Sequence, residues 1–275
     1  MTAMRITKKT LAQKLGISRS SLYYRPKKPA KDEAVKKEIE AVMSNNKAYG
    51  QRRVAFALGM NKKKAKRIMC KFGLKPRIRR AARPAKPDDK GQPEIGKENI
   101  AIRLCPIRTC VLWAGDFTYI RLGGWFWYLA TVIDVFSREI VGWHIANHHT
   151  NALIVEAFKD AVKRTEKTPI WFHSDQGSEY VSGGYETLLA GHGVIPSFSK
   201  KASPWQNGFQ ESFYSNFKLE LKDRCRFDDV GQFIEAVHQQ IAYYNRNRIH
   251  TKLKMSPVCF RQLHEQKTAL MAAVR

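Results

Sequence analysis

The sequence lacks a long, uninterrupted apolar segment. Its longest apolar stretch, residues 125–135, is broken by Thr131 and Asp134 and is too short to cross a bilayer. The N-terminus is too basic, and its apolar run too short, for a secretory signal peptide. These absences argue against a membrane protein and predict a soluble, cytoplasmic one.

Cysteine is also scarce. The chain has five cysteines, an odd number, and none of them forms a C-x-x-C pair. This pattern predicts neither a disulfide framework nor a zinc ribbon, and it fits a reducing compartment.

Acidic residues are few in comparison with basic ones. The chain carries 49 Lys and Arg against 24 Asp and Glu, a net charge of +25. Residues 1–100 hold 28 basic and 8 acidic residues, a net of +20, so residues 101–275 hold only +5 of that charge. Such a segregated polycation predicts binding to a polyanion through phosphate neutralisation. A generally solvated, lysine-rich surface is the alternative.

The first 75 residues show two helical units. In residues 1–30, leucines at helical spacing are followed by Gly16 and by Ser18, which can cap a short second helix. This outline predicts a helix-turn-helix with Arg19 and Ser20 toward DNA, although small helical hairpins that bind no DNA look similar. Residues 31–75 predict a second, helix-turn-helix-like unit.

The second unit and the segment after it are strongly basic. The last helix of the unit, expected within 61–74, has a basic outer face that includes Lys63 and Arg67, which we expect to contact phosphates. A solvated charged face is the alternative. Residues 76–105, rich in proline and glycine, are expected to be a linker whose Arg79 and Arg80 lie along DNA.

The pattern changes to α/β near residue 106. Strands are expected at 111–120, 125–136, 139–146, 169–175 and 194–198, and helices at 151–164, 183–191, 207–223 and 229–245. This element order is typical of an RNase H-like fold, a mixed five-stranded sheet with flanking helices. We expect this core at 106–262, followed by a C-terminal tail at 263–275.

Three acidic residues stand at positions suited to metal binding. Asp116 lies inside an apolar strand, where a charge is costly unless it is paired or binds a metal. Asp175 ends a short strand, and Glu211 lies early in a helix, with 35 residues between them. Carboxylates can hold the two hard cations that phosphodiester cleavage requires. Each residue taken alone also has an ordinary explanation, such as a helix-dipole charge at Glu211.

Several motifs carry a resemblance that covers about residues 5–262. They are WAGDFTYI, TVIDVFSREIVGW, HSDQGSEY, SPWQNGFQESFYSNFKLE and YNRNRIHTKLKMSPVCF. They resemble successive motifs of the retroviral-integrase-like catalytic core. More closely, the chain resembles bacterial insertion-sequence transposases whose catalytic protein comes from the second of two overlapping reading frames.

The resemblance implies a DDE active site. Asp116, Asp175 and Glu211 would be both the catalytic residues and the metal ligands, for two Mg²⁺ ions that Mn²⁺ can replace. Lys218, two helical turns after Glu211, would contact the DNA end; an intrahelical ion pair is its alternative. We expect Lys200 and Lys201, in the loop before the catalytic helix, to face DNA.

Seven further residues are expected to support the site rather than to act in it. Asp134 is interpreted as structural rather than as a further metal ligand, His173 as a core histidine and Asn207 as the cap of the catalytic helix. The C-terminal signature is expected to lock the last helix to the core: Tyr244, Asn245, Arg248 and His250. For Arg248, a contact with DNA is the alternative.

The predicted function is that of a transposase that cuts one strand at each end of an insertion sequence and transfers the freed 3′-hydroxyl. Its partners would be double-stranded DNA, both the inverted repeats and the target. We expect a homo-oligomer on DNA, association with the nucleoid, and an upstream-frame protein or fusion as a further partner. The alternatives are a nuclease that only cuts and a catalytically silent, transposase-derived DNA-binding regulator.

Overall fold

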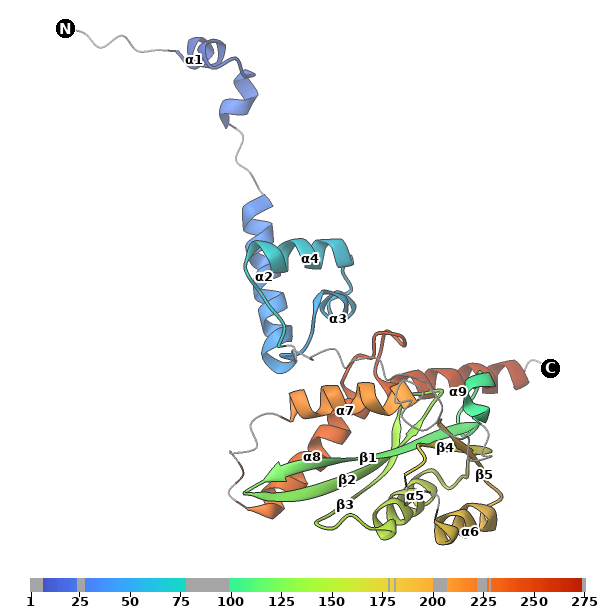
Figure 1. Cartoon of the computed structure of the whole chain (residues 1–275). Coiled ribbons are helices and arrows are strands. Elements are labelled where there is room, and N and C mark those ends of the chain that lie inside the picture. Colours follow the sequence, from blue (N-terminus) through green and yellow to red (C-terminus); the bar gives the residue numbers. More distant parts are fainter. Residues whose placement is uncertain are drawn as a thin grey trace, which may run out of the picture.

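The computed structural model of the chain describes residues 7–23, 28–77, 99–177, 179–180, 182–199, 207–221, 227 and 229–273. Four of the residues expected to contact DNA lie outside these ranges: Arg79, Arg80, Lys200 and Lys201. A helical N-terminal part stands above an α/β core in the view of Figure 1. In the described part of the chain, no helix is long and apolar enough to span a membrane.

One mixed sheet of five strands forms the centre of the core, in the order β3-β2-β1-β4-β5. The strands are β1 (Leu112–Leu122), β2 (Trp125–Asp134), β3 (Ile140–Ala146), β4 (Trp171–Ser174) and β5 (Ile195–Phe198). β1, β2 and β3 are antiparallel neighbours, whereas β4 runs parallel to β1 and β5 parallel to β4. The prediction of a mixed five-stranded sheet with flanking helices is confirmed.

A two-residue glycine turn joins β1 to β2. Gly123 and Gly124 have φ angles of 56° and 90°, in the region that residues with a Cβ atom rarely adopt. Turns with positive φ at both central residues match the twist of a hairpin. The turn thereby places Leu122 opposite Trp125 and sets the register of the whole hairpin.

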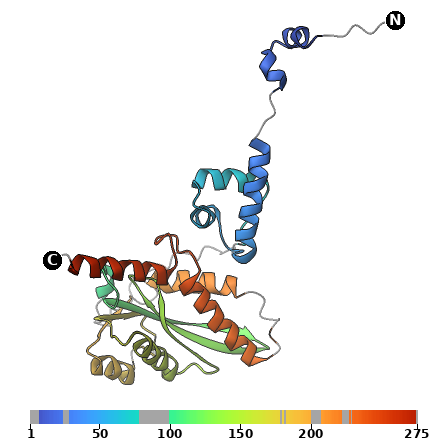
Figure 2. The same ribbon diagram turned by 180° about the vertical axis from the view of Figure 1, so that it is seen from behind.

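Helices cover both faces of the sheet. On one face, here called the α5 face, α5 (Asn151–Thr165) and α6 (Gly183–Gly191) pack over Trp113 and Phe172. On the other, the α7 face, α7 (Gly208–Glu220) and α8 (Val230–Arg246) pack over Leu112, Ala114 and their neighbours. Figures 1 and 2 show the two helix pairs on opposite sides of the sheet.

The contact between α5 and β3 requires glycine at position 142. A Cβ atom on Gly142 would lie 2.4 Å from the backbone nitrogen of Ala161 and 2.5 Å from the carbonyl oxygen of Ala157. Backbone atoms of a helix cannot move aside as a flexible side chain can. Any larger residue at this position would therefore push α5 away from the sheet.

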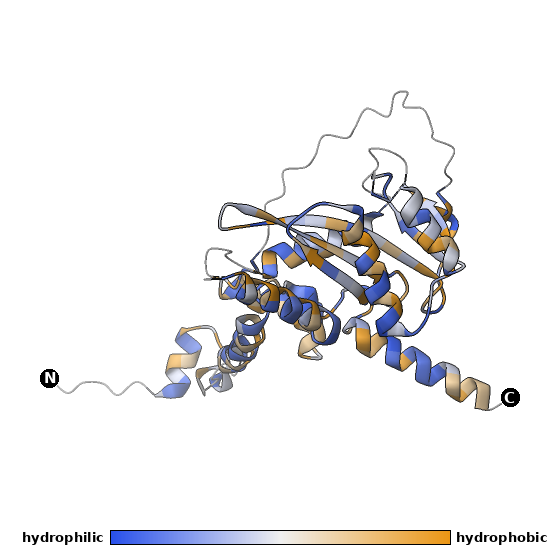
Figure 3. Cartoon of the chain, turned by 90° about the horizontal axis from the view of Figure 1, so that it is seen from below, coloured by the Kyte–Doolittle hydropathy of each residue, from blue (hydrophilic) through white to orange (hydrophobic). Residues whose placement is uncertain are grey.

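A last helix, α9 (Pro257–Ala273), follows the core. A C-terminal tail was expected at 263–275, but residues 263–273 continue this helix. The helix leaves the sheet, as Figure 3 shows from below, and its outer half carries the exposed Leu270 and Met271. Because Pro257 is the only buried residue in α9, its apolar pattern was too weak to predict a helix.

The second N-terminal unit is a three-helix cluster made of α2 (Lys28–Asn45), α3 (Gln51–Ala57) and α4 (Lys62–Lys71). Its small core includes the fully buried Ile39 and Ile68. Asn61 caps α4, because its side-chain oxygen accepts a hydrogen bond from the backbone of Lys63 at 2.8 Å. The last helix of the unit, α4, falls within the range 61–74 in which it was expected.

The first N-terminal unit is smaller. It consists of α1 (Lys8–Lys14) and a 3₁₀ helix, η1 (Arg19–Tyr23). Ser18 precedes η1, and its hydroxyl accepts a hydrogen bond from the backbone of Ser21 at 3.2 Å, as expected for a cap. The second element of the expected helix-turn-helix is thus a short 3₁₀ turn, and DNA binding by this unit stays a prediction.

The three-helix cluster contacts the end of the core. The Tyr49 hydroxyl accepts a hydrogen bond from the backbone of Ile249 at 2.7 Å, and Tyr243 bonds to Asn46. Ile249 also packs against the small core of the cluster. The cluster therefore rests on the segment that follows α8.

Candidate active site

The parallel pairing of β1 and β4 brings two of the predicted carboxylates together. Ala114 lies opposite His173 in this pair. Asp116 and Asp175 each follow two residues later, and side chains two apart in an extended chain point to the same face. Ala114 packs in the α7-face cluster, so Asp116 and Asp175 lie on that face as well.

The third carboxylate, Glu211, is held near them by the way α7 sits on the sheet. Its neighbour Gln210 is completely buried and donates hydrogen bonds to the carbonyl oxygens of Ala114, at 2.6 Å, and Thr131, at 3.0 Å. One turn later, the Tyr214 hydroxyl donates to the carbonyl oxygen of Asp116 itself, at 2.6 Å. These bonds fix the first turns of α7, and with them Glu211, against the strand that carries Asp116.

Thr131 of β2 completes this polar network. Its hydroxyl donates to the Gln210 side-chain oxygen at 2.9 Å and lies 2.8 Å from the Tyr214 hydroxyl. Gln210 and Tyr214 were not among the residues predicted for the site. Their signal was present: they lie four apart, in line with Phe213 and Phe217, on the buried side of a helix whose other side is polar.

The charges of both other carboxylates act on Asp116. Burial, followed by repulsion from Asp175 and then from Glu211, raises the pKa of Asp116 to about 7. A hydrogen bond from the backbone of Phe117 and the charge of Lys218 act in the opposite direction. Burial also raises the pKa of Asp175, in spite of a hydrogen bond from the backbone of Gly177 at 3.1 Å.

The donor set fits hard divalent cations. Carboxylate oxygens are the ligands that Mg²⁺ prefers, and a bound cation would relieve the repulsion that raises the pKa of Asp116. Among the described residues, no group of three or more acidic, histidine or cysteine side chains is already gathered tightly enough to hold an ion. Three like charges without a cation repel one another, so a preassembled cluster is not required for the fit.

Asn207 and Lys218 lie on α7, one before and one after Glu211. The Lys218 ammonium lies 4.9 Å above the Tyr119 ring and is near enough to Asp116 to lower its pKa. Asn207 stands at the N-cap position, but its side chain does not cap the helix. It donates instead to the carbonyl oxygen of Gly115 at 3.2 Å, because the buried strand backbone offers an acceptor there. The expectation of a capping side chain was wrong.

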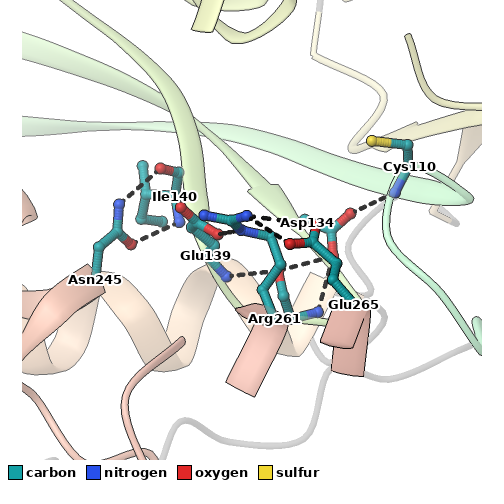
Figure 4. Close-up of polar contacts among 8 residues, drawn as sticks. Cys110, Asp134, Glu139, Ile140, Asn245, Arg261 and Glu265 are labelled. Atoms are coloured by element: carbon teal, nitrogen blue, oxygen red, sulfur yellow. Dashed lines mark hydrogen bonds and ion pairs between the residues drawn. The ribbon is translucent and has the colours of Figure 1, made fainter. Parts of the chain in front are cut away.

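Asp134 and His173 make structural contacts. Asp134 is buried opposite Trp113, on the α5 face, away from Asp116. Its carboxylate accepts hydrogen bonds from the backbone and hydroxyl of Ser137 and from the backbone of Cys110 (Figure 4). His173 is buried with its Nδ1 atom 3.1 Å from the Ser197 hydroxyl.

The C-terminal signature residues join α8 to its surroundings. Asn245 bonds to both the backbone nitrogen and the carbonyl oxygen of Ile140 on β3, as Figure 4 shows. Arg248 is only 1% exposed and bonds to Glu220 at 2.8 Å and to Asn216, both on α7. Tyr244 packs edge-on against Phe213 of α7.

His250 and Arg261 lie beside this junction. His250 forms a bridge with Met255, and burial, followed by the charges of nearby arginines, lowers its pKa to about 4. Arg261 of α9 pairs with Glu139 at 2.7 Å and with Glu265 at 3.1 Å (Figure 4). These contacts tie α9 to the turn between β2 and β3.

The described residues expected to contact DNA differ in whether their side chains are already paired with another residue. Arg19, Ser20 and Lys63 are exposed. Arg67 forms a two-pronged ion pair with Asp32 at 2.6 and 2.7 Å, and Lys71 joins it at 2.8 Å. Hydrogen bonds from Arg67 and then from Lys71 hold the pKa of Asp32 well below its usual range. Part of the positive charge of α4 is therefore neutralised within the cluster.

Comparison with known proteins extends this picture. Two family models, both described as "Integrase core domain", match residues 108–204 and 192–257. The putative transposase InsK for insertion sequence element IS150 of Escherichia coli K12 is 30% identical over 259 residues, which span 89% of this chain and 90% of that protein. The transposase for IS904 of Lactococcus lactis is 37% identical over 144 residues, 52% of this chain and 57% of that protein.

A solved structure supports the fold assignment. The simian T-cell lymphotropic virus intasome, determined in complex with PP2A regulatory subunit B56 gamma, contains a chain that aligns with a TM-score of 0.50. The alignment covers 82% of this chain and 74% of that one, at 16% sequence identity. At this identity the similarity concerns the fold alone, and it confirms the predicted RNase H-like arrangement.

Proposed function

Since this chain belongs to the bacterial insertion-sequence transposases with an integrase core domain, we propose that it cuts and joins DNA at the ends of its element. The carboxylates of Asp116, Asp175 and Glu211 form the active centre of this proposal. The observation that carries it is the placement of all three on the α7 face, with charges that interact through Asp116.

The proposed reaction has two steps. Water attacks a phosphodiester at the element end, which leaves a 3′-hydroxyl and a 5′-phosphate. The 3′-oxygen then attacks a second phosphodiester, forms a new bond to that phosphorus and releases the 3′-oxygen of the broken strand, which takes up a proton. The first step hydrolyses a phosphodiester and the second exchanges one phosphodiester for another, so neither step needs a redox partner or a covalent bond to the protein.

The three carboxylates would hold two Mg²⁺ ions, or Mn²⁺ in their place. Bound cations would supply Lewis acidity toward the phosphate and lower the pKa of the attacking water or hydroxyl. Gln210 and Tyr214 keep Glu211 in place through their bonds to the strand backbone. Lys218, close to Asp116, places a positive charge where the DNA end would lie.

DNA binding is proposed for the N-terminal helical units. Residues 1–100 carry a net charge of +20, and the exposed lysines of α4 follow one another along the helix. Counterion release from inverted-repeat and target DNA would drive this binding, with Arg19, Ser20 and Lys63 among the contacts. Contacts by Arg79, Arg80, Lys200 and Lys201, a homo-oligomer on DNA and an upstream-frame partner belong to the same proposal.

A strand-transfer assay tests the proposal. The full chain is incubated with Mg²⁺ and a pre-cut duplex of the element's own inverted repeat that ends in a 3′-hydroxyl. We expect joined products from the wild type and none above background from Asp116→Asn or Glu211→Gln, while both variants still bind the duplex. Joining by either variant at the wild-type rate would contradict the assignment.

Two other outcomes identify the alternatives. Cutting of an uncut end without joining of a pre-cut one would make the chain a nuclease. DNA binding by the wild type with neither activity would make it a DNA-binding regulator. Lys218→Gln is expected to weaken end binding with a reduced dependence on salt, which is the signature of one lost phosphate contact.

A further inference from the structure

The β1–β2 hairpin carries an unusual number of exposed aromatic side chains. Tyr119 is 58% exposed and Phe126 is 48% exposed, although large aromatics normally bury most of their area. Their rings contact each other edge-on, with centroids 5.5 Å apart. Both rings keep about half of their surface open to solvent.

The exposed pair belongs to a continuous aromatic stripe on one side of the hairpin. Tyr119 lies opposite Tyr128, and residues paired across an antiparallel ladder share a face. The His149 ring stacks on Tyr128 at 5.3 Å and contacts Phe117 at 4.4 Å. The stripe therefore runs from the buried end of the hairpin to its tip, and we call it the aromatic stripe: Phe117, Tyr119, Phe126, Tyr128 and His149.

Positive charges border the stripe. The Lys218 ammonium lies 4.9 Å over the centre of the Tyr119 ring. Arg121, which is exposed, lies opposite Phe126 on the same face of the hairpin. Aromatic rings interleaved with cations are the composition of surfaces that bind single-stranded nucleic acid.

The stripe lies on the α5 face of β1, the opposite face from the carboxylates, but close to them along the strand. Tyr119 follows Asp116 by three residues on one strand, a distance of about 10 Å. β4 pairs with β1 only at residues 112–114, so among the described residues no strand covers that edge of β1 from Asp116 onward. Lys218 comes from the α7 face, and its ammonium group still lies over the Tyr119 ring. A side chain can therefore reach from one face to the other around this uncovered edge of β1.

From these observations we infer that the aromatic stripe is a stacking platform for unpaired bases of the DNA end whose phosphate lies at Asp116. This inference rests on the proposed function and adds a binding site to it. The bases next to the reacting phosphate would leave the duplex and stack on Tyr119 and Phe126, while Arg121 and Lys218 contact their phosphates. A second copy of this chain is a poorer occupant, because lysine is depleted at the centre of protein interfaces.

Fluorescence of a reporter base tests the inference by binding alone, without strand cleavage or joining. The probes are two duplexes of the element end, one blunt and one with a three-nucleotide single-stranded end that contains 2-aminopurine. Binding of the full-length chain is measured in EDTA, so that neither cutting nor joining interferes. We expect the wild type to prefer the single-stranded end and to quench its fluorescence through stacking.

The variants replace aromatic rings with an apolar side chain. Tyr119→Leu and Phe126→Leu should each bind the single-stranded end about tenfold more weakly, while binding to the blunt duplex is unchanged. Trp125→Leu is the matched control, because Trp125 is 77% exposed on the same hairpin but lies opposite Leu122, on the other face. Circular dichroism melting curves check that each variant is folded.

The outcomes separate the inference from the proposed function. Equal binding of both duplexes by the wild type, unchanged preference in the Tyr119 and Phe126 variants, or an equal loss in the Trp125 variant would overturn the stacking platform alone. Dissociation of a dimer in the Leu variants, seen by sedimentation without a change in base fluorescence, would assign the stripe to contact between copies. Failure of the wild type to bind either duplex would contradict the proposed function itself.

Discussion

The two faces of the sheet are built in different ways. On the α5 face, Phe158 is fully buried and meets Trp113, Phe172 and Tyr185 edge-on, with ring centroids 5.6–6.4 Å apart. On the α7 face, buried polar side chains of α7 bond directly to backbone oxygens of β1 and β2.

This difference matters for the active centre. Apolar contacts depend on the volume that is filled and have no preferred direction, whereas a hydrogen bond fixes both distance and direction. The contacts on the α5 face therefore stabilise the fold. Those on the α7 face stabilise it and also fix the position of α7 relative to the sheet. The carboxylates lie on the face where position is controlled.

The largest effect on stability is expected on the α5 face. Phe158→Ala removes a fully buried ring and leaves a cavity, which should lower the free energy of unfolding by about 3–5 kcal/mol. Strand transfer per folded molecule, measured below the melting temperature, should stay within about twofold of the wild type. A much larger loss of activity in the folded fraction would show that this face also positions the carboxylates.

A smaller loss of stability with a larger loss of activity is expected from Gln210→Leu on the α7 face. The substitution leaves the carbonyl oxygens of Ala114 and Thr131 without this donor, at a cost of about 1–3 kcal/mol in unfolding free energy. A misplacement of Glu211 by about 1 Å would slow joining by about a hundredfold. Denaturant unfolding and the joining assay measure the two effects on the same preparation.

Activity measured with Mg²⁺ and with Mn²⁺ shows how Gln210→Leu lowers the rate of joining. If Gln210 acts by positioning Glu211, the apparent Mg²⁺ requirement should rise along with the loss of rate, and a high concentration of Mn²⁺ should recover part of the activity. A loss of activity that follows the loss of folded protein, with the metal requirement unchanged, would make Gln210 a purely structural residue.

The smallest effects come from two buried tyrosines, one on each face. Tyr214→Phe deletes a hydroxyl that bonds to the Asp116 carbonyl and should cost about 1 kcal/mol in unfolding free energy, with slower joining. Tyr185→Phe deletes a hydroxyl that has no partner among the described residues, so stability should be unchanged or slightly higher. Equal effects of the two substitutions on joining would remove the distinction between the faces.

Much of the core could be predicted from the sequence because its signals are local. Alternating and helical apolar patterns located the five strands and the helices from α5 to α8 to within a few residues. The positions of Asp116 and Asp175 on their strands followed from the same patterns. The pairing of β4 with β1, which brings these two residues to one face, depends on distant contacts that no local pattern contains.

The residues that were missed depend on tertiary contacts. In the sequence, Gln210 is an ordinary polar residue of a helix. Only the packing of α7 on the sheet shows that it is buried. Arg67 has the sequence pattern of a free phosphate-binding arginine, but Asp32, 35 residues away, forms an ion pair with it. The helical part of the expected C-terminal tail escaped notice because α9 has almost no buried face to impose an apolar period.

The central claim is that Asp116, Asp175 and Glu211 together hold the cations of the reaction. Anomalous diffraction from a crystal of the full chain bound to a pre-cut element end in Mn²⁺ tests it most directly. We expect two peaks about 3.5–4 Å apart, bordered by oxygens of these three side chains on the α7 face. Peaks that avoid Asp116, or well-ordered carboxylates with no Mn²⁺ between them in a DNA-bound crystal, would contradict it.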